Sequence, residues 1–121
     1  PHFQIGLWET HLFIWFAIIY ETENKKKIGK IFEKKIDQIW EAIDDEFYWS
    51  KDHTKPEAMK QKDLTKEGLR SLFQRLQTVK KGEILCGVNI PREEVGSMYE
   101  TDLIEKVEDT FEQLMFLYKL I

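Results

Sequence analysis

The chain has 121 residues, of which 42% are hydrophobic and 33% are charged, and its formal net charge is −4. This length and composition are typical of one globular domain and exclude an intrinsically disordered chain. The negative balance disfavours general binding to nucleic acid or to anionic membranes. The single cysteine, Cys86, excludes an internal disulfide and a multi-cysteine zinc site. No signal peptide is evident, and we expect a cytoplasmic protein.

Residues 1–22 are rich in aromatic side chains, and the run from Leu12 to Tyr20 contains no polar residue. The β-branched and aromatic residues of this run favour a strand, whereas the absence of Pro and Gly from Leu7 to Thr22 favours a helix. We predict a helix over residues 7–22 that is apolar nearly all round and has to be covered by other helices or by a second subunit. The run is too short to span a bilayer, which takes about 20 residues, so we expect no membrane partner.

Residues 25–49 show the clearest helical period in the chain. Their apolar residues recur in steps of three and four, at Ile28, Phe32, Ile36, Ile39, Ile43 and Phe47. The first half of this segment is rich in lysine and the second half is rich in acidic residues. A helix dipole favours the opposite order by about 0.3–1 kcal/mol per charge. We therefore predict one helix over 25–49 whose charges serve a function other than helix stability.

The middle of the chain predicts two further helices and a long connection. Pro56 suits the first turn of a short helix near 56–62. Residues 65–81 carry an apolar stripe, and either Asp63 or Thr65 can cap the N-terminus of that helix. Residues 82–96 contain three turn-forming residues and are predicted to be irregular. A short strand or a single helical turn at Pro91–Val95 are the alternatives for this connection.

The last predicted helix covers residues 98–120. Ser97 and Glu100 have the spacing of a capping box, and apolar residues then repeat every three to four positions. With the helices at 7–22, 25–49 and 65–81, the predicted fold is all-α: a single helical domain over residues 1–121, built as a bundle of about four main helices.

No set of residues predicts a catalytic, cofactor-binding or metal site. None of the three histidines (His2, His11 and His53) has a glutamate three residues before it, as di-metal helical bundles require. Asp52 and His53 do not share a helical face. Cys86 lies in an apolar context, where a thiol behaves as a small buried hydrophobe. We therefore expect no metal, no cofactor and no enzymatic activity.

The acidic and aromatic end of the 25–49 segment is the best candidate for a binding surface. It combines dense negative charge with large rings, and such residues attract basic partners and anchor interfaces. The predicted partner-binding residues are Glu41, Asp44, Asp45, Glu46, Tyr48 and Trp49. Our hypothesis is a small acidic protein-binding module. It would act as an inhibitor or immunity-type protein that covers the basic active site of a partner protein, such as a nuclease toxin.

Two alternative functions remain open from the sequence. The lysine-rich segments 25–35 and 51–81 predict a nucleic-acid-associated or regulatory protein if they meet on one surface. The apolar predicted helix at 7–22 would instead suit a homo-oligomeric structural subunit, in which a second copy covers it.

Overall fold

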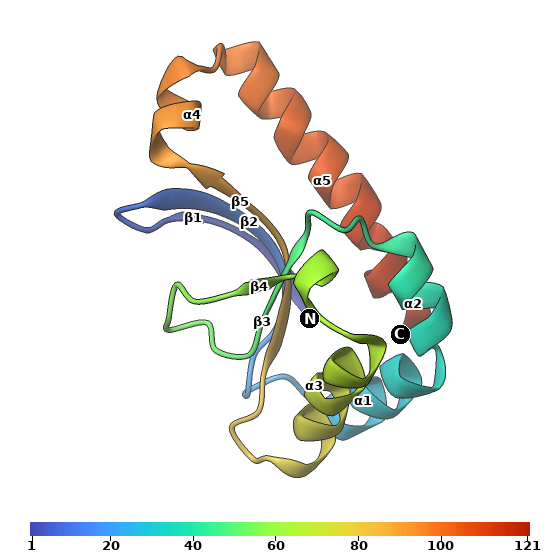
Figure 1. The fold of residues 1–121 in the computed structure, drawn as a ribbon. Coiled ribbons are helices and arrows are strands. Elements are labelled where there is room, and N and C mark those ends of the chain that lie inside the picture. The colour runs from blue at the N-terminus through green and yellow to red at the C-terminus, as the bar shows by residue number, and fades with distance from the viewer.

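The computed structural model describes residues 1–121 and contains a five-stranded sheet with helices packed against it (Figure 1). In chain order the elements are β1 (His2–Leu7), β2 (His11–Ile18), α1 (Lys25–Lys34), α2 (Ile36–Ala42), β3 (Tyr48–Ser50), β4 (Met59–Lys60), the 3-10 helix η1 (Gln61–Asp63), α3 (Lys66–Thr78), β5 (Ile84–Pro91), α4 (Arg92–Ser97) and α5 (Glu100–Leu120). The strand order is β1-β2-β5-β3-β4, and all neighbouring strands are antiparallel. The predicted all-α bundle is therefore wrong.

A β-hairpin occupies the place of the predicted helix 7–22. β1 and β2 pair along their whole length, and the turn between them spans residues 8–10. In β2, Ile14 and Phe16 face the main core, while Trp15 and Ala17 belong to a second buried cluster. Because both faces of β2 are covered, its sequence lacks the alternation of polar and apolar residues that indicates a half-exposed strand.

β5 is the central strand of the sheet and replaces the predicted irregular connection 82–96. Its residues from Ile84 to Val88 are all buried, so this strand also reads as a continuous apolar run. Gly87 lies opposite Trp15 on one neighbouring strand and opposite Tyr48 on the other. A Cβ atom at this position would collide with the carbonyl oxygen of Ile14. The glycine that suggested a turn therefore permits a close approach of two strands.

The predicted helix 25–49 is two helices followed by a turn and strand β3. The break lies at Lys35, and α2 ends at Ala42. Ile43 then has an extended backbone, yet it is 2% exposed and lies in the same core as the stripes of α1 and α2. The apolar spacing thus continues past the end of the helix because the following segment also faces the core.

The predicted helices at 65–81 and 98–120 are confirmed in position as α3 and α5. Thr65 caps α3, since its hydroxyl accepts a hydrogen bond from the Gly68 N–H at 2.9 Å. The predicted capping box is wrong, because Ser97 ends α4 and its hydroxyl donates to the Glu94 carbonyl. The predicted short helix 56–62 is also wrong, because β4 and η1 occupy its second half.

The main core lies between the sheet and helices α1, α2, α3 and α5, which cover one face of it (Figure 1). The smaller cluster around Trp15 and Leu85 lies on the opposite face, beside the loop that joins β3 to β4. None of the helices combines the length and the apolar character needed to cross a membrane.

Candidate functional site

The sheet is incomplete on one side of β5. β2 pairs with β5 from Ile84 to Pro91, whereas β3 pairs with it only from Leu85 to Gly87. Beyond Gly87 this side of β5 carries no strand and borders a hollow of about 480 Å³. The other walls are α4, α5 and residues 44–48, and we call this hollow the β5 cleft.

Asn89 is the residue of β5 that the missing strand leaves without partners. Hydrogen-bonded pairs alternate along an antiparallel ladder, and the Arg92 N–H donates to the Thr10 carbonyl at the end of the β2 pairing. The backbone N–H and C=O of Asn89 consequently point to the side of β5 that β3 does not reach. The side-chain oxygen Oδ1 of Asn89 is also shielded from solvent and has no hydrogen-bond partner.

Residues 44–47 form a tight turn at the mouth of the β5 cleft. The Asp44 carboxylate accepts a hydrogen bond from the Glu46 N–H at 2.8 Å, and the Phe47 N–H donates to the Asp44 carbonyl at 3.0 Å. These acids lie beyond the end of α2, so the predicted conflict between them and a helix dipole does not exist. The turn presents the acidic side chains to solvent while Phe47 is buried.

Glu46 is neutralised by two lysines from the neighbouring strand and η1. Lys60 and Lys62 donate to its two carboxylate oxygens at 2.8 and 2.9 Å. These hydrogen bonds hold the pKa of Glu46 at about 2. Glu46 is therefore less available to an outside partner than its sequence context indicated.

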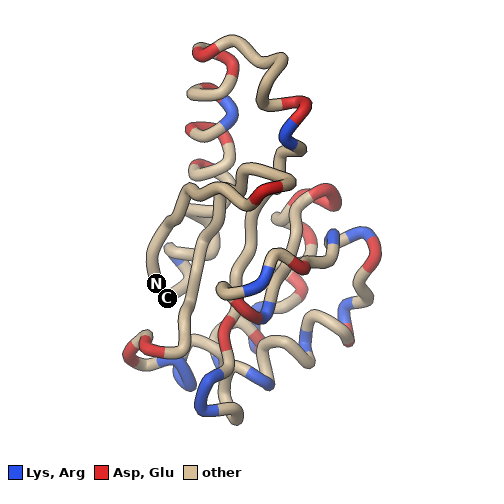
Figure 2. The backbone as a smooth tube through the Cα atoms, turned by 90° about the vertical axis from the view of Figure 1, so that its left-hand side faces the viewer, with Lys and Arg blue, Asp and Glu red and all other residues tan.

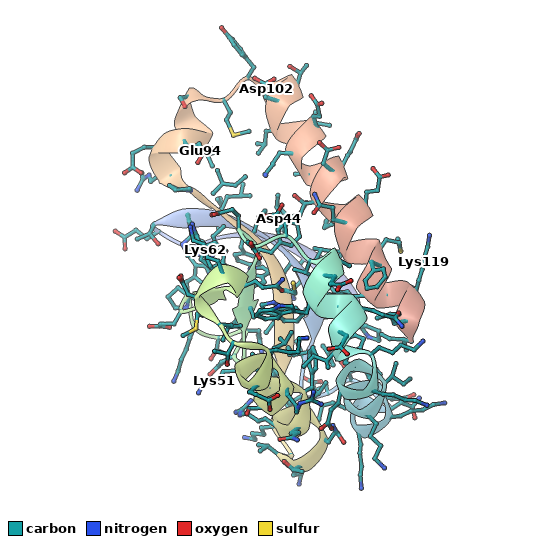
Figure 3. All side chains as sticks on the ribbon, turned by 45° about the vertical axis from the view of Figure 1, so that its right-hand side comes forward. Asp44, Lys51, Lys62, Glu94, Asp102 and Lys119 are labelled. Carbon is teal, nitrogen blue, oxygen red and sulfur yellow. The ribbon has the colours of Figure 1, made fainter.

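Asp44 and Glu94 are the free carboxylates of the β5 cleft. They come from the turn after α2 and from α4, on two sides of the hollow (Figure 3). Neither forms a salt bridge within the chain. Two cations line the cleft, Lys60 and Lys106. Lys60 binds Glu46, so Lys106 on α5 is the lining cation that forms no salt bridge. The lining of the cleft thus carries more acceptors than free cations: two carboxylates and the backbone carbonyl of Asn89.

The structure brings together only half of the predicted partner-binding residues. Asp44, Glu46 and Tyr48 line the β5 cleft, whereas Glu41 and Asp45 are exposed but do not line it. The sixth predicted residue, Trp49, is 2% exposed and lies in the main core. Its Nε1–H donates to the Gln61 side chain at 3.0 Å. It therefore cannot serve as an exposed anchor.

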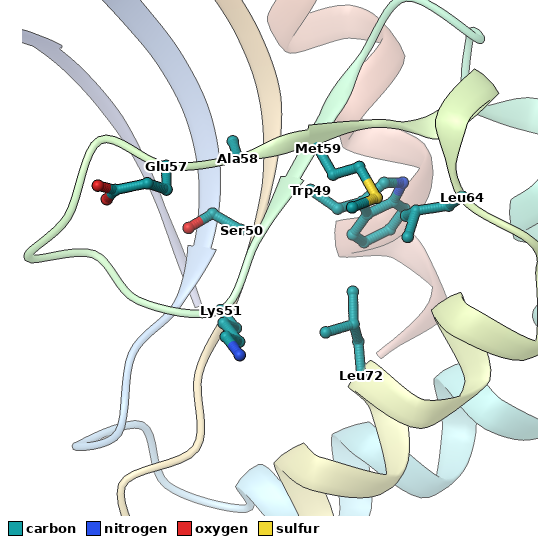
Figure 4. Close-up of a pocket in the computed structure, with 8 residues that line it drawn as sticks. All are labelled: Trp49, Ser50, Lys51, Glu57, Ala58, Met59, Leu64 and Leu72. Carbon is teal, nitrogen blue, oxygen red and sulfur yellow. The ribbon is translucent and has the colours of Figure 1, made fainter.

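Trp49 instead borders a second hollow of about 320 Å³ between the β3–β4 hairpin and α3 (Figure 4). Met59, Leu64 and Leu72 line it with apolar atoms, while Lys51 and Glu57 lie at its rim. Its size is at the lower limit of small-molecule sites. The lining offers apolar contact and no converging set of polar groups, so the β5 cleft is the better-equipped site.

His53 and Glu83 form the closest pair of titratable side chains outside the β5 cleft. The His53 Nδ1 lies 2.8 Å from each Glu83 oxygen, and the backbone N–H groups of His53 and Tyr20 also donate to this carboxylate. Burial raises the pKa of Glu83, but these hydrogen bonds outweigh it and the net pKa is lowered. Asp52 completes a group that could reach one metal ion. However, its oxygen already accepts two hydrogen bonds from Thr54, so an ion would have to displace existing partners.

The lysines of α1 lie next to the C-terminal end of α3. Lys25 donates from Nζ to the carbonyls of Val79, Lys80 and Gly82 at 3.0, 2.6 and 2.9 Å. This pairing accounts for a lysine at a helix N-terminus, because the carbonyl groups at the C-terminal end of α3 carry partial negative charge and favour a cation. Figure 2 shows basic residues gathered at this end of the molecule and acidic residues along α5. The alternative of nucleic-acid binding through these lysines stays a prediction.

The sequence places the chain in a defined family. A profile described as "Domain of unknown function (DUF1054)" matches residues 1–118. The chain belongs to the DUF1054 family. Curated relatives carry the name UPF0637 protein: one in Bacillus velezensis is 52% identical over 120 residues, and one in Bacillus licheniformis is 48% identical over the same length. A relative in Bacillus cereus is 42% identical.

These DUF1054 relatives are longer than the chain described here. The alignments include 99% of this chain but 57% of the Bacillus velezensis and Bacillus licheniformis proteins and 58% of the Bacillus cereus protein. The chain therefore spans a little over half the length of the curated relatives it matches.

The lining residues that sequence reasoning missed come from β4, β5, α4 and α5. Asn89 interrupts an apolar run, which is a usable sign of a polar group at a sheet edge. Glu94 carried no such sign, because its position across the cleft from Asp44 depends on the sheet bringing β5 next to β3.

Proposed function

We propose that this DUF1054 chain is a protein-binding module that holds an extended, basic polypeptide segment in the β5 cleft. The observation that carries the proposal is the free side of β5 at Asn89, where backbone and side-chain groups have no partner in the chain. A segment lying beside β5 would satisfy these groups as an added strand. Such strand addition draws affinity from main-chain hydrogen bonds and specificity from the side-chain sites that flank the edge.

The charge of the cleft favours lysine or arginine on the bound segment. Asp44 and Glu94 are exposed carboxylates without internal salt bridges, and a bound cation would contact one or both. Opposite charges of this kind raise the rate of association and select among partners more than they add affinity. Salt screens exposed charges over about 10 Å at 0.1 M, so association should slow as ionic strength rises.

The proposal is one of binding rather than catalysis, and it puts the protein in the cytoplasm. An inhibitor that covers a basic active site would be one form of such a module, and that narrower role stays a prediction. Three features of the structure support the proposal: the free strand edge, the two carboxylates without salt bridges and the hollow beside them.

Selection from a displayed library of random nine-residue peptides tests the proposal. Peptides retained by the chain should be enriched in Lys and Arg alternating with apolar residues. Nuclear magnetic resonance shifts on adding a selected peptide should concentrate in residues 44–48 and 88–94. A variant carrying Asp44→Lys and Glu94→Lys should bind the same peptides about 10- to 100-fold more weakly.

A charge-matched control separates local binding from net charge. Glu23→Lys and Glu108→Lys change the net charge equally at two exposed sites outside the β5 cleft. This control should bind within about twofold of the parent at 0.15 M salt. Equal weakening in both variants, or selected peptides without basic residues, would refute the proposal.

A further inference from the structure

β1 is the edge strand on the far side of the sheet from the β3–β4 hairpin, and it pairs only with β2. At the hairpin turn the Trp8 N–H donates to the His11 carbonyl. Because hydrogen-bonded pairs alternate along an antiparallel ladder, the N–H and C=O groups of Phe3, Ile5 and Leu7 point to the open side. A regular six-residue strand thus leaves three residues with unpaired backbone groups.

The side chains of this edge are apolar and uncovered. Ile5 is 53% exposed and Leu7 is 77% exposed, on the sheet face that packs against the helices. Ile104 on α5, the helix that packs on this face, is 50% exposed. Natural edge strands are usually protected by charged residues, proline or bulges, and β1 has none of these.

A hollow of about 470 Å³ lies at the Leu7 end of β1. Leu7, Leu12 and Val95 contribute apolar atoms to its lining. His11 lines the same hollow, and its Nε2 is shielded from solvent without any hydrogen-bond partner. A shielded nitrogen without a partner usually marks a missing donor or acceptor. At this end of β1, Leu7 therefore lacks apolar neighbours and the His11 imidazole lacks a hydrogen-bond partner.

We infer that this surface, defined by Ile5, Leu7 and His11, is a contact surface inside the longer DUF1054 proteins. Its occupant is a segment from the part of the family's length that this chain does not match. That segment adds a strand beside β1, covers the apolar side chains and bonds to the His11 imidazole. The length argument supports this occupant over a second copy. This chain matches 57% of the Bacillus velezensis relative, and a strand takes only about 5–6 residues. The inference is independent of the β5 cleft, which lies on the other side of β5.

Hydrogen exchange on two proteins tests the inference: the 121-residue chain and the full-length Bacillus velezensis relative. The amides of Ile5 and Leu7 should exchange rapidly in the chain. The amides at the aligned positions of the relative should exchange at least about 100-fold more slowly. Rapid exchange at these positions in both proteins would overturn the inference. An exchange rate in the 121-residue chain that is slow and falls further as the protein concentration rises would also overturn the inference. A second copy of the chain would then be the occupant.

A pair of substitutions adds an independent measurement. Leu7→Lys should change the melting temperature of the chain by no more than about 2 °C, because the side chain is already solvated. Lysine at the aligned position of the full-length relative should lower its melting temperature by about 5 °C or more, because that position is covered. Lysine at the position aligned with Val79, which is 40% exposed after α3, should have little effect in either protein. A small effect of lysine at position 7 and at the aligned position of the relative would contradict the inference that this surface is covered in the longer proteins.

Discussion

The side chain of Gln61 should contribute more to stability than any other polar side chain in the protein. It is fully buried and makes three hydrogen bonds. Its Oε1 accepts from the Trp49 Nε1–H at 3.0 Å, and its Nε2 donates to the carbonyls of Trp40 and Ile43 at 2.9 and 2.7 Å. These bonds join η1 to β3 and to the end of α2, directly before the turn at the mouth of the β5 cleft.

Gln61→Met keeps the length and approximate volume of the side chain but removes all three bonds. Each buried polar group left without a partner costs about 1–3 kcal/mol. The Trp40 carbonyl is only partly buried and can recruit water, so the full cost falls on the Trp49 N–H and the Ile43 carbonyl. We expect a loss of about 3–5 kcal/mol, a large share of the 5–15 kcal/mol that stabilises a typical domain.

Urea unfolding followed by tryptophan fluorescence and by far-ultraviolet circular dichroism measures this loss. With a slope of about 1–3 kcal/mol per molar urea, the midpoint should fall by roughly 2 M. Gln74→Met is the matched control, because Gln74 is exposed and donates one side-chain bond to Glu33, so its midpoint should barely move. A Gln61→Met protein that loses less than about 1 kcal/mol with an unchanged slope would refute the reasoning.

Three further predictions follow from contacts described above. Gly87→Ala should prevent stable folding, because its Cβ would collide with the backbone of β2. Gly96→Ala lies in open space on α4 and should raise the free energy of unfolding by about 0.5–1 kcal/mol. Thermal unfolding distinguishes the two variants, and equal effects would contradict this prediction. Lys25→Met should cost about 1–3 kcal/mol by urea unfolding, because three carbonyls after α3 lose a charged donor, while Lys26→Met should be neutral. The lowered pKa of Glu83 means that its carboxylate stabilises the fold above its ordinary pKa of 4.5 and loses this effect as the pH falls further. Glu83→Gln should therefore flatten the fall in stability below about pH 4.5, and an unchanged pH profile would show that other carboxylates are responsible.

The parts of the fold that the sequence predicts are those with one buried face. α3 and α5 each have a solvated side, so their apolar residues recur with the helical period. β2 and β5 are covered on both faces, and a continuous apolar run does not distinguish a strand from a helix. The turn after β1 contains Glu9 and Thr10 but no Gly or Pro. The sequence therefore contains no strong indication of a turn between the two strands of the hairpin.

The candidate site was predictable only where its residues are neighbours in the sequence. Asp44, Glu46 and Tyr48 lie together in the chain and were recognised as acidic and aromatic. Asn89 and Glu94 join them through the pairing of β3 with β5, which local patterns do not encode. The interaction of Glu46 with Lys60 and Lys62 was hidden for the same reason, and it changes the charge that a partner would meet.

The central place of β5 has a consequence for biosynthesis. The chain leaves the ribosome from its N-terminus, so the β1–β2 hairpin is complete long before Ile84 and its neighbours exist to pair with Ile18. At about 5–20 residues per second, the hairpin waits several seconds with one side of β2 open. That side carries the backbone groups of a strongly aromatic strand, which can pair with other chains in the meantime. We expect the nascent chain to depend on chaperone protection during this interval, and slowing translation between α1 and β5 should lower its soluble yield.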